Sequence, residues 1–117
     1  GYIPREFGKL QSLENLRLDK NQICGMIPEE LGECKQLRII YLNDNQLEGD
    51  IPSSFGQLRD LSYLYLQNNK LDGDFPIFFT RLESLSALNL NQNNFSGSIP
   101  PEVKELRIPM LVFFFSF

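Results

Sequence analysis

The side chains that could carry chemistry in this chain of 117 residues are two close pairs of carboxylates and two cysteines. Glu29 with Glu30, and Asp72 with Asp74, have a spacing that acid–base catalysis or calcium binding could use. The sequence contains no histidine, the commonest general base and a favoured zinc ligand. It also lacks EF-hand spacing and a glycine-rich phosphate loop. We therefore expect no catalytic residue, no metal site and no cofactor, and the chain is predicted not to be an enzyme.

The overall charge argues against one class of partner. The net charge is −4, and the lysines and arginines do not cluster. Nucleic acid binding requires a basic surface that neutralises phosphates. We therefore exclude nucleic acid as a partner. The hydrophobic content of 42% and charged content of 22% are those of a folded domain.

The elements that must position these side chains follow from a repeat of 24 residues without insertion from Gly1 to Leu106. Three columns of leucine or isoleucine are followed by a column of asparagine and then by recurring glycine and proline. The leucine columns begin at Leu13, Leu16 and Leu18, the glycines are Gly1, Gly25, Gly49, Gly73 and Gly97, and the prolines are Pro4, Pro28, Pro52, Pro76 and Pro100.

Each repeat contains a strand signal followed by turn signals. The alternation of Leu16 and Leu18 predicts a short strand with its leucines inward, and only neighbouring repeats can bury them. Leu31 and Cys34, with their counterparts, predict a short 3₁₀ turn on the convex side. The predicted fold is an α/β-type solenoid, a leucine-rich repeat with short parallel strands on the concave face and 3₁₀ turns on the convex face.

The asparagine column follows the strand at the point where the chain must turn inward. An amide side chain has two donors and an acceptor, so it can satisfy the backbone groups that this turn leaves unpaired. Asn45 and Asn69 are expected to be buried, whereas replacing the outward-pointing Asn68 by Ala is expected to cost little. The predicted structural ladder is Asn21, Asn45, Asn69 and Asn93.

The columns also assign the polar candidates to surface or core. Asp72 shares its position with Glu48 and Asp74 with Ser98, which indicates solvated positions. Cys24 lies in the same polar column as Asp72 and is expected to be exposed. Cys34 lies in a leucine column and is expected to be a small core residue. A disulfide between the two cysteines is therefore not expected.

The repeat resembles the plant-specific class of leucine-rich repeat, as in the segment LSYLYLQNNKLDGDFPIFFTRLES from Leu61 to Ser84. It is similar to the ectodomains of receptor-like kinases and receptor-like proteins, and to polygalacturonase-inhibiting proteins. The resemblance covers residues 1 to about 106. The paired-cysteine caps of the family and its transmembrane and kinase segments have no counterpart in these residues. Because the sequence opens on Gly1 without an initiator methionine and closes on Phe117 within an apolar run, we interpret the chain as a piece of a longer protein. Any membrane attachment would come from parts outside this chain.

Binding in such a solenoid is expected on the concave face, where the strand residues between the leucines point outward. Tyr41, Tyr63 and Tyr65 fall in these positions and, with Ile39, should form one patch, because neighbouring strands lie about 4.8 Å apart. Tyrosine suits an interface, although strands also favour it on ordinary surfaces. The candidate ligand-binding residues are Arg17, Asp19, Ile39, Tyr41, Asn43, Tyr63, Tyr65, Gln67, Asn89 and Asn91.

Two further features concern modification and the C-terminal end. Asn94-Phe95-Ser96 is the only glycosylation sequon, so Asn94 is a candidate glycosylation site.

The solenoid is assigned to residues 1–106, one partial and four full repeats without caps, and residues 107–117 are an off-pattern apolar tail. The tail could be a degenerate strand in which Val112 fills a leucine position, the edge of a hydrophobic segment, or residues foreign to the repeat domain. We favour the third interpretation.

Three functions remain open. The first is a fragment of a receptor ectodomain that binds a peptide ligand or a partner ectodomain at the cell surface, outside the cell. The second is a secreted inhibitor of a microbial cell-wall hydrolase, and the third is a structural spacer within a longer solenoid. The resemblance favours the first.

Overall fold

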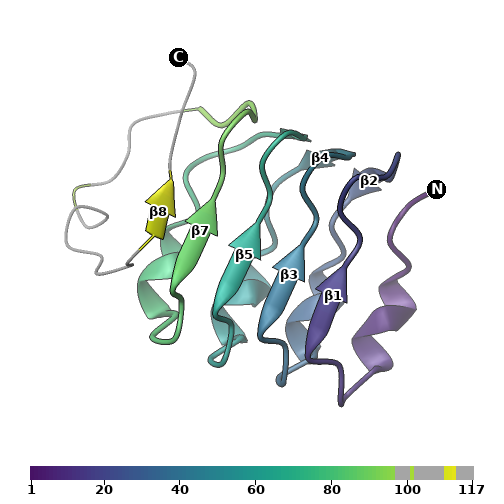
Figure 1. Cartoon of the computed structure of the whole chain (residues 1–117), viewed down its shortest axis with the longest axis vertical. Helices are drawn as coiled ribbons and strands as arrows, with labels where there is room; N and C mark the ends of the chain where they lie inside the picture. The colour runs from purple at the N-terminus through teal and green to yellow at the C-terminus, as the bar shows by residue number, and fades with distance from the viewer. Residues whose placement is uncertain (97–100, 102–109, 113–117) are drawn as a thin grey trace.

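A computed structural model describes residues 1–96, residue 101 and the backbone of residues 110–112. Within these residues the repeats stack side by side, with one sheet in front and a row of short helices behind it (Figure 1). The 24-residue period therefore gives the predicted leucine-rich repeat solenoid, with parallel strands on one face and 3₁₀ helices on the other. None of the helices in this described part reaches the length and apolarity that a bilayer crossing requires.

The concave sheet is parallel and has the strand order β1-β3-β5-β7-β8. From β1 to β7, each residue pairs with the residue 24 positions further along the chain. Leu16 pairs with Ile40, Ile40 with Leu64 and Leu64 with Leu88. The central residues of these four strands are buried. The strand bounds are β1 Asn15–Arg17, β3 Ile39–Tyr41, β5 Tyr63–Tyr65, β7 Ala87–Asn89 and β8 Met110–Val112.

Strand β8 bears on the three interpretations of the tail. Its backbone pairs in parallel with β7, so Met110–Val112 add one strand to the repeat sheet, as in the degenerate-strand interpretation that we did not favour. The register differs from the one given there, because Leu111 pairs with Leu88 where a spacing of 24 would place Val112. The spacing between paired residues is therefore one residue shorter between β7 and β8 than between the earlier strands, and a constant 24-residue period could not predict this change. The origin of residues 107–117 stays a prediction. The rest of the tail, 107–109 and 113–117, lies outside the described residues.

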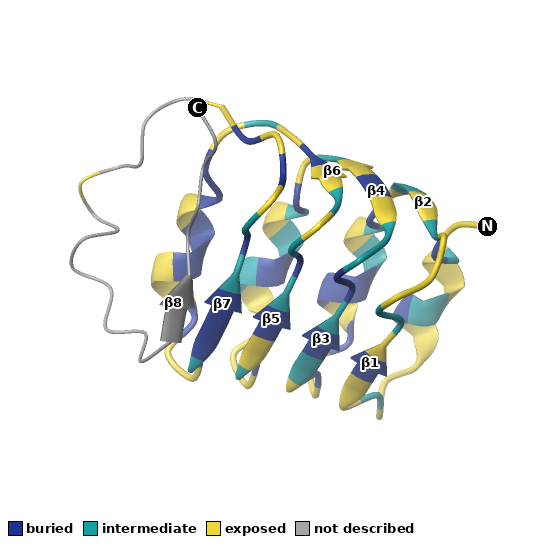
Figure 2. Ribbon diagram, turned by 45° about the horizontal axis from the view of Figure 1, so that its top comes forward, coloured by how far each residue is buried: buried dark blue, intermediate teal, exposed yellow. Residues whose placement is uncertain are grey.

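A second parallel sheet, which we did not predict, runs along one edge of the solenoid in the order β2-β4-β6 (Figure 2). Its strands are β2 Cys24–Met26, β4 Gln46–Gly49 and β6 Lys70–Leu71. Three of the recurring glycines, Gly25, Gly49 and Gly73, lie in or just after these strands and have φ of 82°, 81° and 86°. Positive φ is a conformation that glycine adopts without strain, which explains why glycine recurs at these positions.

The convex side consists of five-residue 3₁₀ helices, each preceded by a proline of the repeat: η1 Arg5–Lys9, η2 Glu29–Glu33, η3 Ser53–Gln57 and η4 Ile77–Arg81. A second glycine column, which we did not recognise, sets how closely they pack. A Cβ on Gly8 would lie 2.6 Å from the backbone oxygen of Glu30, and one on Gly32 would lie 2.5 Å from the Cβ of Ser54. The first three helices therefore approach each other at distances that only glycine permits at these positions.

The core lies between the two layers and continues through all the repeats. It consists of the leucine columns, of Ile3, Ile27 and Ile51 before the prolines, and of Leu31, Phe55 and Phe79 from the helices. Cys34 is fully buried among them, as its leucine column predicts.

Candidate binding face

The asparagine ladder fixes the ends of the concave strands. The Nδ2 of Asn69 donates to the backbone oxygens of Leu66 and Leu42, the second of which belongs to the preceding repeat. Its Oδ1 accepts the backbone N–H of Leu47 at 3.0 Å. Asn45 and Asn93 make the equivalent bonds. Each of these side chains therefore connects two repeats.

The burial of the ladder differs from expectation. Asn93 is buried, but Asn45 and Asn69 are half-buried and Asn21 is exposed. Asn21 donates only to oxygens of its own repeat, those of Leu18 and Asp19. Exposure therefore decreases along the described ladder from Asn21 to Asn93, while the bonding in the inner repeats is maintained.

Three of the candidate residues form a continuous stack across the concave face, which we call the aromatic row. The rings of Tyr41 and Tyr65 lie 4.7 Å apart with an angle of 7° between their planes. The guanidinium carbon of Arg17 lies 5.2 Å from the centre of the Tyr41 ring, which is within cation–π distance. The two rings cover each other's faces, so both tyrosines are half-buried and not fully exposed as we expected.

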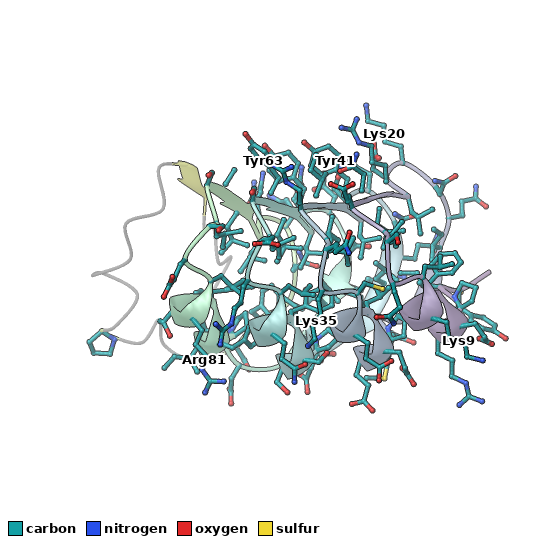
Figure 3. All side chains as sticks on the ribbon, turned by 90° about the horizontal axis from the view of Figure 1, so that it is seen from below. Lys9, Lys20, Lys35, Tyr41, Tyr63 and Arg81 are labelled. Carbon is teal, nitrogen blue, oxygen red and sulfur yellow. The ribbon has the colours of Figure 1, made fainter. Side chains whose placement is uncertain are left out.

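A second row lies beside it. Tyr63 is 39% exposed and Ile39 is half-buried, and these two residues pair across β3 and β5. Tyr41 and Tyr63 point away from the helical layer that carries Lys35 and Arg81 (Figure 3). The sheet thus brings Ile39, Tyr41, Tyr63 and Tyr65 together as one patch, whereas the next residue in this row, Ala87, is small and buried.

The polar candidates beside the aromatic row are partly engaged within the protein. Asn43 is buried, and its Nδ2 donates to the carboxylate of Asp44 at 2.6 Å. The Oδ1 of Asn89 accepts the backbone N–H of Asn91 at 3.0 Å. Asp19, Gln67 and Asn91 are half-buried and Arg17 is exposed. Asn43 and Asn89 therefore have fewer groups free for a ligand than the sequence suggested.

The structure also shows a row of residues that the sequence analysis missed. Lys20, Asp44, Asn68 and Gln92 recur every 24 residues and have φ between 57° and 60°, although none is glycine. Asn68 donates to the carboxylate of Asp44 at 2.7 Å, so replacing it by Ala would remove a bond and strain the backbone. We therefore now predict a larger cost for this replacement than the sequence suggested. The prevalence of Asn and Asp at this column was a signal that could have identified it.

The carboxylate of Asp44 accepts hydrogen bonds from two side chains, those of Asn43 and Asn68. Hydrogen bonds from Asn43 and Asn68 hold the pKa of Asp44 below its ordinary value, and the positive charge of Lys20 adds to this effect. The carboxylate joins two neighbouring repeats, because Asn68 belongs to the next one. Its chemistry is that of a structural anion.

The remaining chemical candidates lie apart from one another. Cys24 is exposed and Cys34 buried, and both are free thiols. Burial, and then the negative charge of Glu33, raise the pKa of the Cys34 thiol. Glu29, Asp72 and Asp74 are exposed and Glu30 is half-buried. Over the described ranges, no three His, Cys, Asp or Glu residues are grouped so that they could hold a metal ion. Asn94 is exposed, next to the buried Asn93 and Phe95.

Comparison with solved structures shows extensive similarity. A plant peptide hormone receptor, RGFR1 in complex with RGF2, is 42% identical with a TM-score of 0.91, over 96% of this chain and 18% of that chain. The Arabidopsis receptor kinase HAESA, solved with the peptide hormone IDA and the co-receptor SERK1, is 35% identical with a TM-score of 0.90, over 97% of this chain and 20% of that one. A plant ice-binding protein is 39% identical with a TM-score of 0.82, over 86% of this chain and 33% of that one. This chain thus spans about a fifth of the length of the two receptors.

The family comparison agrees with the structural one. No curated protein matches the chain. Leucine rich repeat models match residues 12–34 and 35–95. The second match alone covers more than half of the 117 residues. The chain therefore belongs to the leucine-rich repeat family.

Proposed function

We propose that this chain is part of a receptor ectodomain and binds a peptide ligand or a partner ectodomain on its concave face. The observation that carries the proposal is the patch of Tyr63 and Ile39 beside the stacked Arg17, Tyr41 and Tyr65. Two of the similar structures are receptors solved with peptides, RGF2 and IDA. The similarity to an ice-binding protein means that the fold alone does not select a ligand, so the proposal depends on these side chains.

The geometry of the patch favours a polypeptide. Because Tyr41 and Tyr65 cover each other's ring faces, the stack presents ring edges and hydroxyls outward, and hydroxyls can bond to a peptide backbone. The stack also holds its side chains in place before binding, which reduces the entropy lost when a ligand orders them. Tyr63, with its exposed ring, offers a contact for an apolar ligand side chain.

We further infer an extracellular location, with a glycan on Asn94. The supporting observations are the exposure of Asn94 and the similarity to plant receptors.

A peptide selection tests the binding proposal. A library of random synthetic peptides is selected on the 117-residue chain, and the affinities of the selected peptides are then measured for Tyr63→Ala and for Arg81→Ala. Arg81 is exposed on the helical side, so its replacement is the control (Figure 3). We expect Tyr63→Ala to weaken binding by about tenfold or more, as truncating an aromatic interface residue does, and Arg81→Ala to leave it unchanged. If no selected peptide distinguishes the two variants, the concave patch is ordinary surface, as in the spacer alternative.

A further inference from the structure

A groove of about 540 Å³ lies along the side of the solenoid, away from the concave face, where the chain passes from the second sheet into the convex helices. It crosses three consecutive repeats, with lining residues from the segments that follow β2, β4 and β6. These residues include Met26, Glu29, Asp50, Ile51, Asp74 and Phe78.

The glycine column forms part of the structure beneath this groove. A Cβ on Gly49 would lie 2.9 Å from the Cε of Met26, and a Cβ on Gly73 would collide with the carboxylate of Asp50. Side chains of one repeat therefore lie directly over the glycine of the next. The positive φ favours glycine at both positions, and at Gly73 the neighbouring carboxylate of Asp50 also leaves no room for a Cβ.

The lining combines one exposed apolar side chain, that of Met26, and the largely buried Ile51 and Phe78 with carboxylates. Met26 is 61% exposed, which is unusual for a methionine, and its flexible thioether adapts to varied partners. Glu29, Asp50 and Asp74 are exposed, and within the described part of the chain their carboxylates make no hydrogen bond or ion pair. None of the lining residues is a lysine or arginine. The groove therefore presents the exposed side chain of Met26 beside three carboxylates that have no partner among the described residues.

We propose that this groove docks an extended segment of a partner polypeptide that carries lysine or arginine between apolar residues. Cationic side chains complement Glu29, Asp50 and Asp74, and an apolar side chain covers the exposed Met26. Successive repeats are about 4.8 Å apart and alternate side chains of a strand about 6.6 Å, so an extended chain can reach carboxylates of two repeats. A metal ion would leave the exposed Met26 unused, and the described side chains provide no metal-binding group. The concave face takes no part in this contact.

Titration with a defined probe tests the proposal. A ten-residue peptide of alternating lysine and leucine is added to the ¹⁵N-labelled 117-residue chain at low ionic strength, where charge attraction is least screened. A peptide with glutamate in place of lysine is the matched control. We expect the amide signals of Met26, Asp50 and Asp74 to shift with the lysine peptide only, and those of Tyr41 and Tyr63 to stay in place.

Charge-matched variants separate a specific groove from general attraction. Asp50→Asn with Asp74→Asn should weaken binding by about threefold or more at low ionic strength, because it removes two exposed charges that complement a cationic peptide. Asp60→Asn with Glu83→Gln removes the same charge from exposed positions outside the groove and should have little effect. Met26→Ser should also weaken binding, and unchanged unfolding midpoints would show that all three variants fold.

Several results would overturn the proposal. They are absence of binding, equal weakening by both charge-neutral pairs, equal binding of the glutamate peptide, or signal shifts confined to the concave face. Sedimentation provides one more. If the chain alone dimerises and Met26→Ser disperses the dimer, the groove is an interface between two copies of this chain.

Discussion

The side-chain oxygen of Asn69 accepts the backbone N–H of Leu47 across the boundary between two repeats. The same side chain donates to the backbone oxygen of Leu42 in the preceding repeat and to that of Leu66 in its own. One amide thus satisfies backbone groups on both sides of the boundary. Its loss removes the side-chain acceptor of the Leu47 N–H, whereas the carbonyls of Leu42 and Leu66 each keep a donor, the Nδ2 of Asn45 and of Asn93. Leaving that partly buried N–H unpaired costs more than the net gain of an ordinary hydrogen bond.

We therefore predict that Asn69→Ala lowers the free energy of unfolding by about 1–3 kcal/mol. Asn21 is the matched control, because it occupies the same column but is exposed and bonds only within its own repeat. Asn21→Ala should cost distinctly less. Denaturant titration of both variants measures the difference, and equal costs would show that the bonds between repeats contribute little.

The neighbouring Asn68 tests the backbone conformation at the end of the strand. Its φ is 59°, so Asn68→Ala should cost about 1 kcal/mol or more from backbone strain together with the lost bond to Asp44. Asn68→Gly loses the same bond but keeps an unstrained backbone, and it should be the less destabilising of the two. The comparison is again a denaturant titration, and a more stable Ala variant would contradict the left-handed assignment.

The sequence predicted the features that depend on period and on burial. A column of leucines at every twenty-fourth residue can be buried only by stacking, which is why the concave sheet and its register followed from Leu16, Ile40 and Leu64. The same column logic placed Cys24 outside and Cys34 inside. These inferences needed only the side-chain alternation of a strand and the volume of a core.

The features that escaped prediction depend on contacts between repeats. The second sheet forms from backbone groups of β2, β4 and β6 in segments without a clear hydrophobic alternation, so periodicity did not reveal it. The stacking of Tyr41 on Tyr65 reduced an exposure that alternation alone overestimated. The hydrogen bond from Asn43 to Asp44 joins the side chains of adjacent residues. The backbone conformation of the turn decides where these side chains point, so the residue types alone did not predict the bond.

The second glycine column gives a further stability prediction. A Cβ on Gly32 would lie 2.5 Å from the Cβ of Ser54, so Gly32→Ala should force the helices apart and cost about 1–3 kcal/mol. Ser53→Ala changes an exposed side chain of the neighbouring helix η3 and should cost little. Thermal unfolding of the two variants would check this, and a Gly32→Ala variant as stable as the parent would show that the helix spacing is adaptable.

The two thiols should react at very different rates. Cys24 is exposed, whereas Cys34 is buried, its thiol pKa is raised, and its sulfur donates to the backbone oxygen of Phe7 at 3.2 Å. A thiol reagent near pH 8 should therefore label one cysteine at once and the second only on unfolding. Cys24→Ser should abolish the fast reaction. Rapid labelling of both thiols in the folded chain would contradict the burial of Cys34.

Asp44 should make stability depend on pH in the acid range. Its folded-state pKa is lowered by hydrogen bonds from Asn43 and Asn68, so its contribution is complete above the unfolded-state pKa of about 4 and is lost as pH falls through the folded-state value. Asp44→Asn has no such titration. The stability difference between the parent and this variant should shrink as pH falls from about 6 to about 3. A difference that stays constant over this range would show that Asp44 does not bond as its carboxylate.

Asn94 should carry a glycan when the chain passes through a secretory pathway. The sequon Asn94-Phe95-Ser96 places an exposed asparagine beside buried neighbours, so the backbone is held while the acceptor amide faces solvent. Secretion from a plant or yeast host should give a product heavier than the 13.5 kDa polypeptide by one glycan, removable by an amidase that converts Asn94 to aspartate. Asn94→Gln and Ser96→Ala should each abolish the added mass, because both the acceptor and the hydroxyl are required. Asn15→Gln, at an exposed asparagine outside any sequon, should leave the mass shift intact. A secreted, folded chain of unmodified mass would show that Asn94 is not used and would remove one support for the extracellular assignment, while leaving the peptide-binding proposal to its own test.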